Sequence, residues 1–373
     1  MVRAPATREI EVFPEADRLQ GFPHPRETRQ LFGHQNAEQE LSDALQKGQV
    51  HHGWLVTGAP GIGKATLAYR FAKCLLASEA EREAAEGGLS VPEASVANRQ
   101  VMALSHPGLL VLRRPYDPSR KRFMSSIPLD EVRRLRSFLS HRAAEGSWRV
   151  VIVDAADDLN INAANALLKS LEEPPERMVF VLISSEPGRL LNTVRSRCRR
   201  LELNTLDEAS LRAATDQAFK VGDAEPPGED VWGELAELAQ GSVRRLIGMH
   251  FAGGLDLHKS IRGIFGNLPA VKWGQVHTLA ESLAPAAAAE RYKLYNELLF
   301  DFLAGVVRAA AVDEGGTSQR AVASNVVRAE RLASWAALWE TIVREEAETR
   351  ALNLDRRAFI LGTIQRIEAE ARQ

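Results

Sequence analysis

Cysteine and net charge are both scarce in this sequence of 373 residues. The two cysteines, Cys74 and Cys198, lie far apart in the chain. A structural zinc site needs about four ligands and a disulfide framework needs spaced pairs, so we expect neither a zinc ion nor a disulfide. The formal net charge is −2. That value excludes a strong overall attraction to nucleic acid, although not a local basic patch.

Long apolar runs are also absent. No run approaches the roughly 20 residues that a membrane-spanning helix requires. The first residues include Glu9, Glu11, Glu15 and Asp17 and contain no apolar signal-peptide core. We therefore expect a reduced, soluble and cytoplasmic protein without a membrane partner.

A glycine-rich loop is the most informative feature that is present. The stretch LVTGAPGIGKATLA, residues 55–68, places an apolar run before Gly58, Gly61, Gly63 and Lys64, and a helical pattern after them. Such glycines let backbone N–H groups converge on an anion, and the lysine reaches the terminal phosphates of a nucleotide. The spacing predicts a phosphate-binding loop, with a plain glycine turn as the alternative.

Two positions of the expected hydrolytic machinery carry alanine instead. Ala65 stands where a serine or threonine would bind Mg²⁺, and the first hydroxyl is on Thr66. The apolar run 150–153 ends at Asp154, which predicts a buried strand whose carboxylate faces the loop and the magnesium position. A ring-forming ATPase would follow this aspartate with a glutamate, but Ala155 follows here. The other interpretation of Asp154 is a helix-capping residue.

The order of patterns along the chain predicts several domains. Residues 1–30 contain four prolines and are expected to form an extended arm. Strand and helix patterns alternate over residues 31–204, which predicts an α/β nucleotide-binding domain. Strand signals then stop, and we expect a small helical lid at residues 205–262 and a helical oligomerisation domain at residues 263–373. Residues 326–349 are expected to form one helix of that last domain.

Two further motifs carry a family resemblance. NALLKSLEEPP, residues 165–175, and Ser196-Arg197-Cys198 follow the glycine-rich loop and Asp154 in this order. With them the chain resembles the bacterial clamp-loader subunits of the AAA+ superfamily, well over residues 31–250 and weakly over the last hundred. The resemblance implies a RecA-like α/β P-loop module, a small helical lid and an all-α C-terminal collar that joins five subunits into a ring.

The departures from the motor subunits of that family point to one branch of it. Ala65, Ala155 and the absence of a four-cysteine zinc module make the chain similar to the delta-prime subunits of DNA polymerase III. The resemblance implies that Arg197 is an arginine finger acting in trans on the neighbouring subunit's ATP. It also implies that Arg244 is the lid's sensor arginine and that Ser184 or Ser185 takes the other sensor position. Binding of ATP or ADP, with Mg²⁺ only alongside nucleotide, stays open.

The resemblance also implies the partners. They are delta and gamma/tau subunits in a pentameric ring and, through the complex, the sliding clamp and primer–template DNA. We expect no polymerase activity and little or no ATPase activity in this chain. The alternative is an active motor subunit or another AAA+ ATPase in which Thr66 and Asp157 replace the missing groups. Thr66 lies about 100° around the helix from the usual metal ligand, which disfavours that alternative. A small-molecule P-loop kinase would leave the Ser196-Arg197-Cys198 triplet and the long helical tail unexplained.

Overall fold

The computed structural model describes residues 14–85, 87–140, 147–312 and 316–373. The chain divides into two compact units, residues 1–228 with 239–245, and residues 229–238 with 246–373. In the described residues no helix is long and apolar enough to cross a membrane. The predicted four-domain division stays a prediction.

The first unit is built on a parallel sheet with the strand order β2-β5-β6-β1-β7. A short antiparallel hairpin, β3 with β4, lies outside this sheet. The elements of the unit are η1 (Pro25–Glu27), α1 (Gln35–Gln46), β1 (Gly53–Thr57), α2 (Lys64–Leu76), α3 (Glu79–Glu83), α4 (Val96–Met102), β2 (Leu109–Arg113), β3 (Tyr116–Asp117), β4 (Arg122–Phe123), α5 (Leu129–Ser140), β5 (Arg149–Asp154), η2 (Ala156–Asp158), α6 (Ile161–Glu172), β6 (Met178–Ser184), η3 (Pro187–Arg189), α7 (Asn192–Arg195), β7 (Arg199–Glu202) and α8 (Glu208–Val221).

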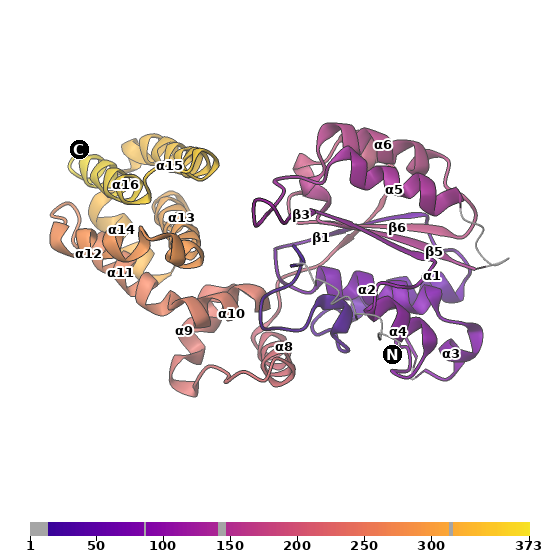
Figure 1. Cartoon of the computed structure of the whole chain (residues 1–373). Helices are drawn as coiled ribbons and strands as arrows, with labels where there is room; N and C mark the ends of the chain where they lie inside the picture. Colours follow the sequence, from indigo (N-terminus) through magenta and orange to yellow (C-terminus); the bar gives the residue numbers. More distant parts are fainter. Residues whose placement is uncertain (1–13, 86, 141–146, 313–315) are drawn as a thin grey trace, which may run out of the picture. The chain divides into compact units, whose positions relative to one another are not determined.

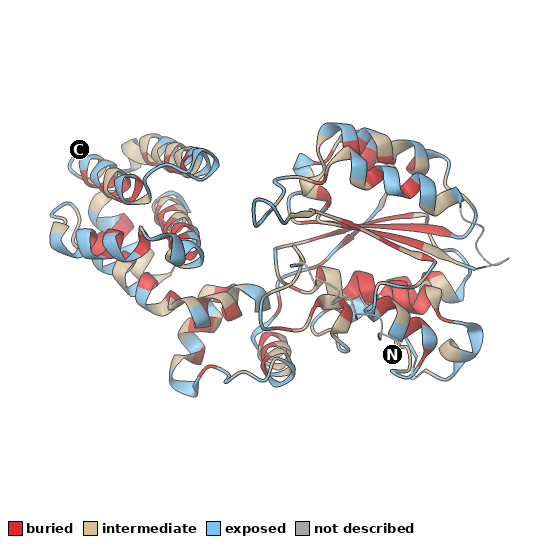
Figure 2. Ribbon diagram, viewed as in Figure 1, coloured by how far each residue is buried: buried red, intermediate tan, exposed pale blue. Residues whose placement is uncertain are grey.

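Helices cover both faces of the sheet, with α1, α2 and α4 on one side and α5 and α6 on the other (Figure 1). The central strands are buried along their length, as their continuous apolar sequences predict (Figure 2). Successive side chains of a strand point to opposite faces, so Val181 joins the core under α2 whereas Leu182 joins the core under α6. The predicted α/β P-loop fold is confirmed.

Residues 14–30 pack against the α/β module. Phe22 is buried and meets Phe219 of α8 edge to face, with ring centroids 5.3 Å apart. Arg26 donates a hydrogen bond from Nε to the carbonyl of Met102 at 2.8 Å, and Lys73 donates from Nζ to the Arg26 carbonyl at 2.7 Å. The first thirteen residues of the predicted arm lie outside the described residues.

All described elements after β7 are helical, as the loss of strand signals predicts. The elements beyond α8 are α9 (Glu229–Ala239), α10 (Val243–Ala252), α11 (Gly254–Gly266), α12 (Trp273–Leu283), η4 (Ala286–Ala288), α13 (Ala289–Val312), α14 (Thr317–Val326), η5 (Ala329–Arg331), α15 (Leu332–Leu352) and α16 (Arg356–Ala371).

The long helix α13 is the centre of the second unit. It packs against α11, α14 and α15, while α16 packs against α12 and α15. Tyr295, Leu299 and Val306 of α13 are completely buried. The single helix predicted over residues 326–349 is wrong, because α14 ends at Val326 and α15 begins at Leu332 after an extended residue at Val327.

Candidate nucleotide site

The glycine-rich loop follows β1 and leads into α2, in the order that the sequence predicts. Gly58, Gly61 and Gly63 have φ values of 144°, 75° and 110°, which side-chain-bearing residues rarely adopt. Close packing adds a second requirement for glycine. A Cβ atom at Gly58 would lie 2.4 Å from the carbonyl oxygen of Leu203, and one at Gly61 would lie 2.5 Å from Cβ of Arg244. The loop conformation therefore depends on these glycines.

Lys64 begins α2 and directs its ammonium group back into the loop. Its Nζ donates hydrogen bonds to the carbonyl oxygens of Gly58 at 2.8 Å and Ala59 at 2.6 Å. A third bond, 2.9 Å long, goes to Oγ of Ser185 at the end of β6. Burial lowers the pKa of Lys64 to about 8, against the opposing effect of Asp154 and Asp157. The lysine is thus held by three oxygens of its own chain.

Asp154 ends β5, and its carboxyl group lies in the electric field of this lysine. The pKa of Asp154 is raised to about 7, chiefly by burial and then by the carboxylate of Asp17. Lys64, Arg244 and Arg113 act in the opposite direction. The structure therefore gathers Lys64, Asp154 and Arg244 of the predicted site around one locus, together with two groups that the sequence did not indicate.

Those two additional groups are Arg113 and Asp17. Arg113 ends β2 and pairs in register with Asp154 on the neighbouring strand. It donates hydrogen bonds to Asp17 at 2.9 Å and to Glu15 at 2.6 Å. The carboxyl ends of parallel strands share one edge, so Arg113 could have been predicted from its place after an apolar run. No pattern in the proline-rich residues 14–30 indicates Asp17.

Asp157 is engaged in binding the loop after β6. Its carboxylate accepts hydrogen bonds from Oγ of Ser184 at 2.5 Å, from the backbone N–H of Ser185 at 2.6 Å and from that of Glu186 at 3.2 Å. These bonds fix the serine pair at the predicted sensor position. They also occupy the carboxylate that the active-ATPase alternative needs as a replacement acid.

Residues 239–245 lie directly on the glycine-rich loop within the same unit. Oγ of Ser242 donates a hydrogen bond to the carbonyl of Pro60 at 2.8 Å, and the backbone N–H of Arg244 donates to the carbonyl of Gly61 at 3.4 Å. Arg244 is exposed, and its charge acts on Asp154. Arg244 therefore lies beside the loop, and its role as a sensor arginine stays a prediction.

The two residues after Lys64 do not match the sequence of a magnesium-binding loop, in which a serine or threonine follows the lysine directly. Ala65 is half-buried and packs against the core between α2 and the sheet, and its side chain has no oxygen to offer a metal ion. Thr66 is half-buried one position further along α2. In the described residues no group of three or more His, Cys, Asp or Glu side chains is arranged to hold a metal ion.

Arg197 lies at the amino ends of the strands, whereas Lys64, Asp154 and Arg244 lie at their carboxyl ends. The carbonyl of Arg197 lies beside Gly53, the first residue of β1, where a Cβ atom would be 3.1 Å away. The loop starts after Thr57, so the length of β1, roughly 13 Å, separates the Arg197 backbone from it. The guanidinium pairs through Nη2 with Glu172 at 2.7 Å and donates from Nη1 to the carbonyl of Thr193 at 2.8 Å. The trans role of Arg197 stays a prediction, and this placement is compatible with it.

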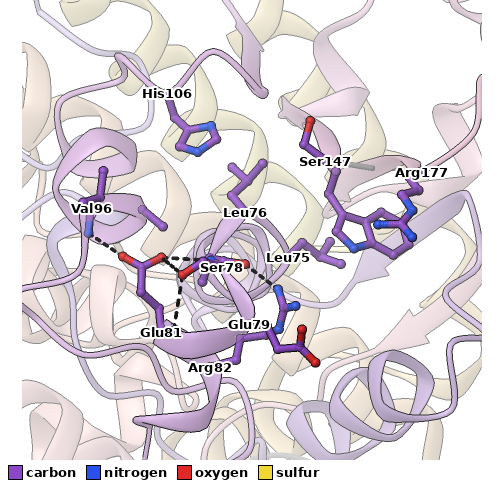
Figure 3. Close-up of a pocket in the computed structure, with 13 residues that line it drawn as sticks. Leu75, Leu76, Ser78, Glu79, Glu81, Arg82, Val96, His106, Ser147 and Arg177 are labelled. Atoms are coloured by element: carbon purple, nitrogen blue, oxygen red, sulfur yellow. Dashed lines mark hydrogen bonds between the residues drawn. The ribbon is translucent and has the colours of Figure 1, made fainter. Parts of the chain in front are cut away.

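A cavity of about 610 Å³ lies at the other end of α2, away from Lys64. Leu75, Leu76 and Trp148 supply apolar lining, and Glu81 and Arg82 are among the charged residues there (Figure 3). Glu81 accepts hydrogen bonds from Ser78 and from the backbone N–H of Val96, so its charge serves helix caps. None of the predicted site residues lines this cavity.

Comparison with known proteins agrees with the sequence motifs. Residues 33–207 match the family model described as DNA polymerase III, delta subunit. The DNA polymerase III subunit delta' of Pseudomonas aeruginosa is 40% identical over 152 residues, which is 41% of this chain and 43% of that protein. Over residues 33–207 the chain is therefore similar to the delta and delta-prime subunits of DNA polymerase III.

Other subunits of DNA polymerase III are similar to this chain at lower identity. The tau/gamma subunit of Haemophilus influenzae is 28% identical over 221 residues, which is 59% of this chain and 30% of that protein. The chain thus spans less than half of the length of either relative. A gamma subunit-related protein of Thermotoga maritima aligns over 90% of this chain and 99% of its own, at 17% identity and a TM-score of 0.44.

Proposed function

We propose that this chain is a non-motor, delta-prime subunit of the clamp loader of a DNA polymerase III holoenzyme. In this proposal it sits in a pentameric ring with delta and gamma/tau subunits and helps load the sliding clamp on primed DNA. The observation that carries the proposal is a complete glycine loop beside Ala65 and Ala155, with Arg197 at the far edge of the same sheet. A chain of this kind lacks its own metal ligand but presents an arginine to a neighbour.

Arg197 would act on the ATP of the adjacent motor subunit. A guanidinium placed there balances the negative charge that builds up on the transferred phosphoryl group. Arginine fingers contribute on the order of 10³ to 10⁵ in rate. The separation of Arg197 from the chain's own loop supports a trans role over a cis role.

The chain's own loop would contribute little or no hydrolysis. If ATP or ADP binds, the N–H groups of the loop and Lys64 would hold its phosphates. Arg244, which lies beside the loop, would contact the nucleotide. Mg²⁺ would enter only with the nucleotide. Lys64 would first have to exchange the oxygens of Gly58, Ala59 and Ser185 for phosphate oxygens. The engagement of Asp157 disfavours the alternative of an active motor or another AAA+ ATPase.

The remaining parts of the proposal concern DNA and location. Contacts to DNA would be made within the complex, to the phosphate backbone and without sequence preference. The proposed place of action is the cytoplasm, and we propose no polymerase activity for this chain.

Reconstitution tests this function. The remaining clamp-loader subunits of the same organism are assembled with and without the full-length chain, and clamp loading on primed DNA and ATP hydrolysis are measured. We expect loading to require the chain, and the isolated chain to release no phosphate from ATP. Hydrolysis by the isolated chain that Lys64→Ala abolishes would contradict the proposal and identify a motor subunit.

A further inference from the structure

The guanidinium of Arg197 is held between the carboxyl end of α6 and the short helix α7. Glu172, the last residue of α6, pairs with Nη2 at 2.7 Å. Thr193 of the short helix α7 accepts from Nη1 at 2.8 Å through its backbone carbonyl. A guanidinium is planar and rigid, so two partners on different nitrogens fix its plane as well as its position.

Glu172 occupies a position that is electrostatically unfavourable for a carboxylate. The C-terminal end of a helix carries partial negative charge and favours cations. Glu172 is exposed, Glu173 follows it with a second negative charge, and prolines 174 and 175 prevent the helix from continuing. The positive charge of Arg197 compensates this arrangement. The pair therefore offsets part of the unfavourable interaction between Glu172 and the helix end.

From this geometry we infer that Glu172 is a positioning residue for Arg197. Its carboxylate and the Thr193 carbonyl hold the guanidinium in one plane at the sheet edge. A guanidinium has five N–H donors, so those left over are available to the phosphate oxygens of a neighbouring subunit's nucleotide. This inference rests on the proposed function and adds to it the residue that orients the finger.

The pair is partly open to solvent, which limits the size of the expected effect. The side chain of Arg197 is 34% exposed and that of Glu172 is 47% exposed. Ion pairs of such exposure contribute modestly, which corresponds to about a two- to five-fold change in a rate that depends on the pair. A larger loss is expected from removal of Arg197 itself.

The test uses the complete reconstituted clamp loader carrying Glu172→Ala, with kcat and KM for ATP measured in the presence of clamp and primed DNA. We expect kcat to fall about two- to five-fold with KM unchanged. Glu173→Ala is the matched control, because it removes the same charge from the next residue, for which no contact with Arg197 is seen in the described structure. It should leave kcat unchanged.

A double variant tests whether Glu172 acts by positioning Arg197 or has a general structural role. In a complex that already carries Arg197→Ala, adding Glu172→Ala should cause no further loss, because the residue it orients is absent. An unchanged or increased kcat for Glu172→Ala alone, or an equal further loss in the Arg197→Ala background, would overturn the inference. If Arg197→Ala itself left ATP hydrolysis intact, the proposed function would fail instead.

Discussion

At the scale of single residues, the site is defined by a lysine and an aspartate that share a buried environment. Lys64 has a pKa of about 8 and Asp154 one of about 7. Burial is the largest cause of both changes and acts against the charged form of each group. The nearby Asp17 adds to the effect on Asp154. The protonation states of Lys64 and Asp154 therefore change close to neutral pH.

This coupling predicts a pH-dependent effect of Asp154→Asn on stability. The folded protein binds the Asp154 proton more tightly than the unfolded chain, whose aspartate titrates near 3.8. The stabilisation by that proton is complete below about pH 4 and is lost as the pH rises through about 7. The asparagine variant has no such loss. We therefore compare the free energies of unfolding of the variant and the wild type. Their difference should change by on the order of 2 kcal/mol in favour of the variant between pH 5 and pH 8.

Urea unfolding of both proteins at the two pH values measures this gain. The measurement compares each variant with itself, so a constant difference caused by altered packing cancels. A difference between the two proteins that does not change with pH would contradict the assigned environment of Asp154.

The residues of the loop could be predicted from sequence because their spacing reflects local geometry. The partners of Lys64 and Arg197 could not. Ser185 follows Lys64 by 121 residues, and Glu172 meets Arg197 only because α6 and β7 reach the same edge of the sheet. Such contacts depend on tertiary packing, which residue spacing alone does not encode.

At the scale of elements, residues 14–30 connect parts of the first unit that are distant in sequence. Burial acts to raise the pKa of Glu15, but hydrogen bonds and charge from Arg26 and Arg113 outweigh it and lower the pKa to about 2. Phe22 meanwhile packs against α8. The segment thus ties α8 to the end of β2 and to α2.

Phe22→Ala tests the contribution of this segment. Phe22 is 7% exposed, and replacing a buried phenylalanine by alanine removes its packing and leaves a cavity. We expect the free energy of unfolding to fall by about 3 kcal/mol, measured by urea denaturation. Phe251→Ala is the control, because Phe251 is 59% exposed and its removal should cost less than about 0.5 kcal/mol. Equal effects of the two substitutions would show that Phe22 adds no stability.

The sequence predicts the elements of the sheet better than those around it. Strands β5 and β6 are continuous apolar runs, which occur mainly in buried parallel strands. In contrast, the break between α14 and α15 carries no glycine or proline, so helical periodicity runs through it. The packing of residues 14–30 was also not apparent, because prolines there indicate only where regular structure is interrupted.

At the scale of the whole molecule, the proposed role of the chain requires a neighbouring subunit. The glycine-rich loop follows the carboxyl end of β1, whereas the backbone of Arg197 lies beside Gly53 at the amino end of the same strand. In a ring, such a subunit would use Arg197 on the next nucleotide site while its own site lacks a metal ligand at Ala65. In this proposal Arg197 accelerates ATP hydrolysis at a site outside this chain.

The most direct test of that claim is ATP hydrolysis by the complete clamp loader, stimulated by clamp and primed DNA, with Arg197→Ala in this chain. The control is Arg195→Ala, which removes an exposed arginine two residues away whose side chain is bonded to Asn192. We predict a large loss for Arg197→Ala at the site that it serves, no loss for Arg195→Ala, and no hydrolysis by the isolated chain. Equal hydrolysis by the wild-type and Arg197→Ala complexes would contradict the account.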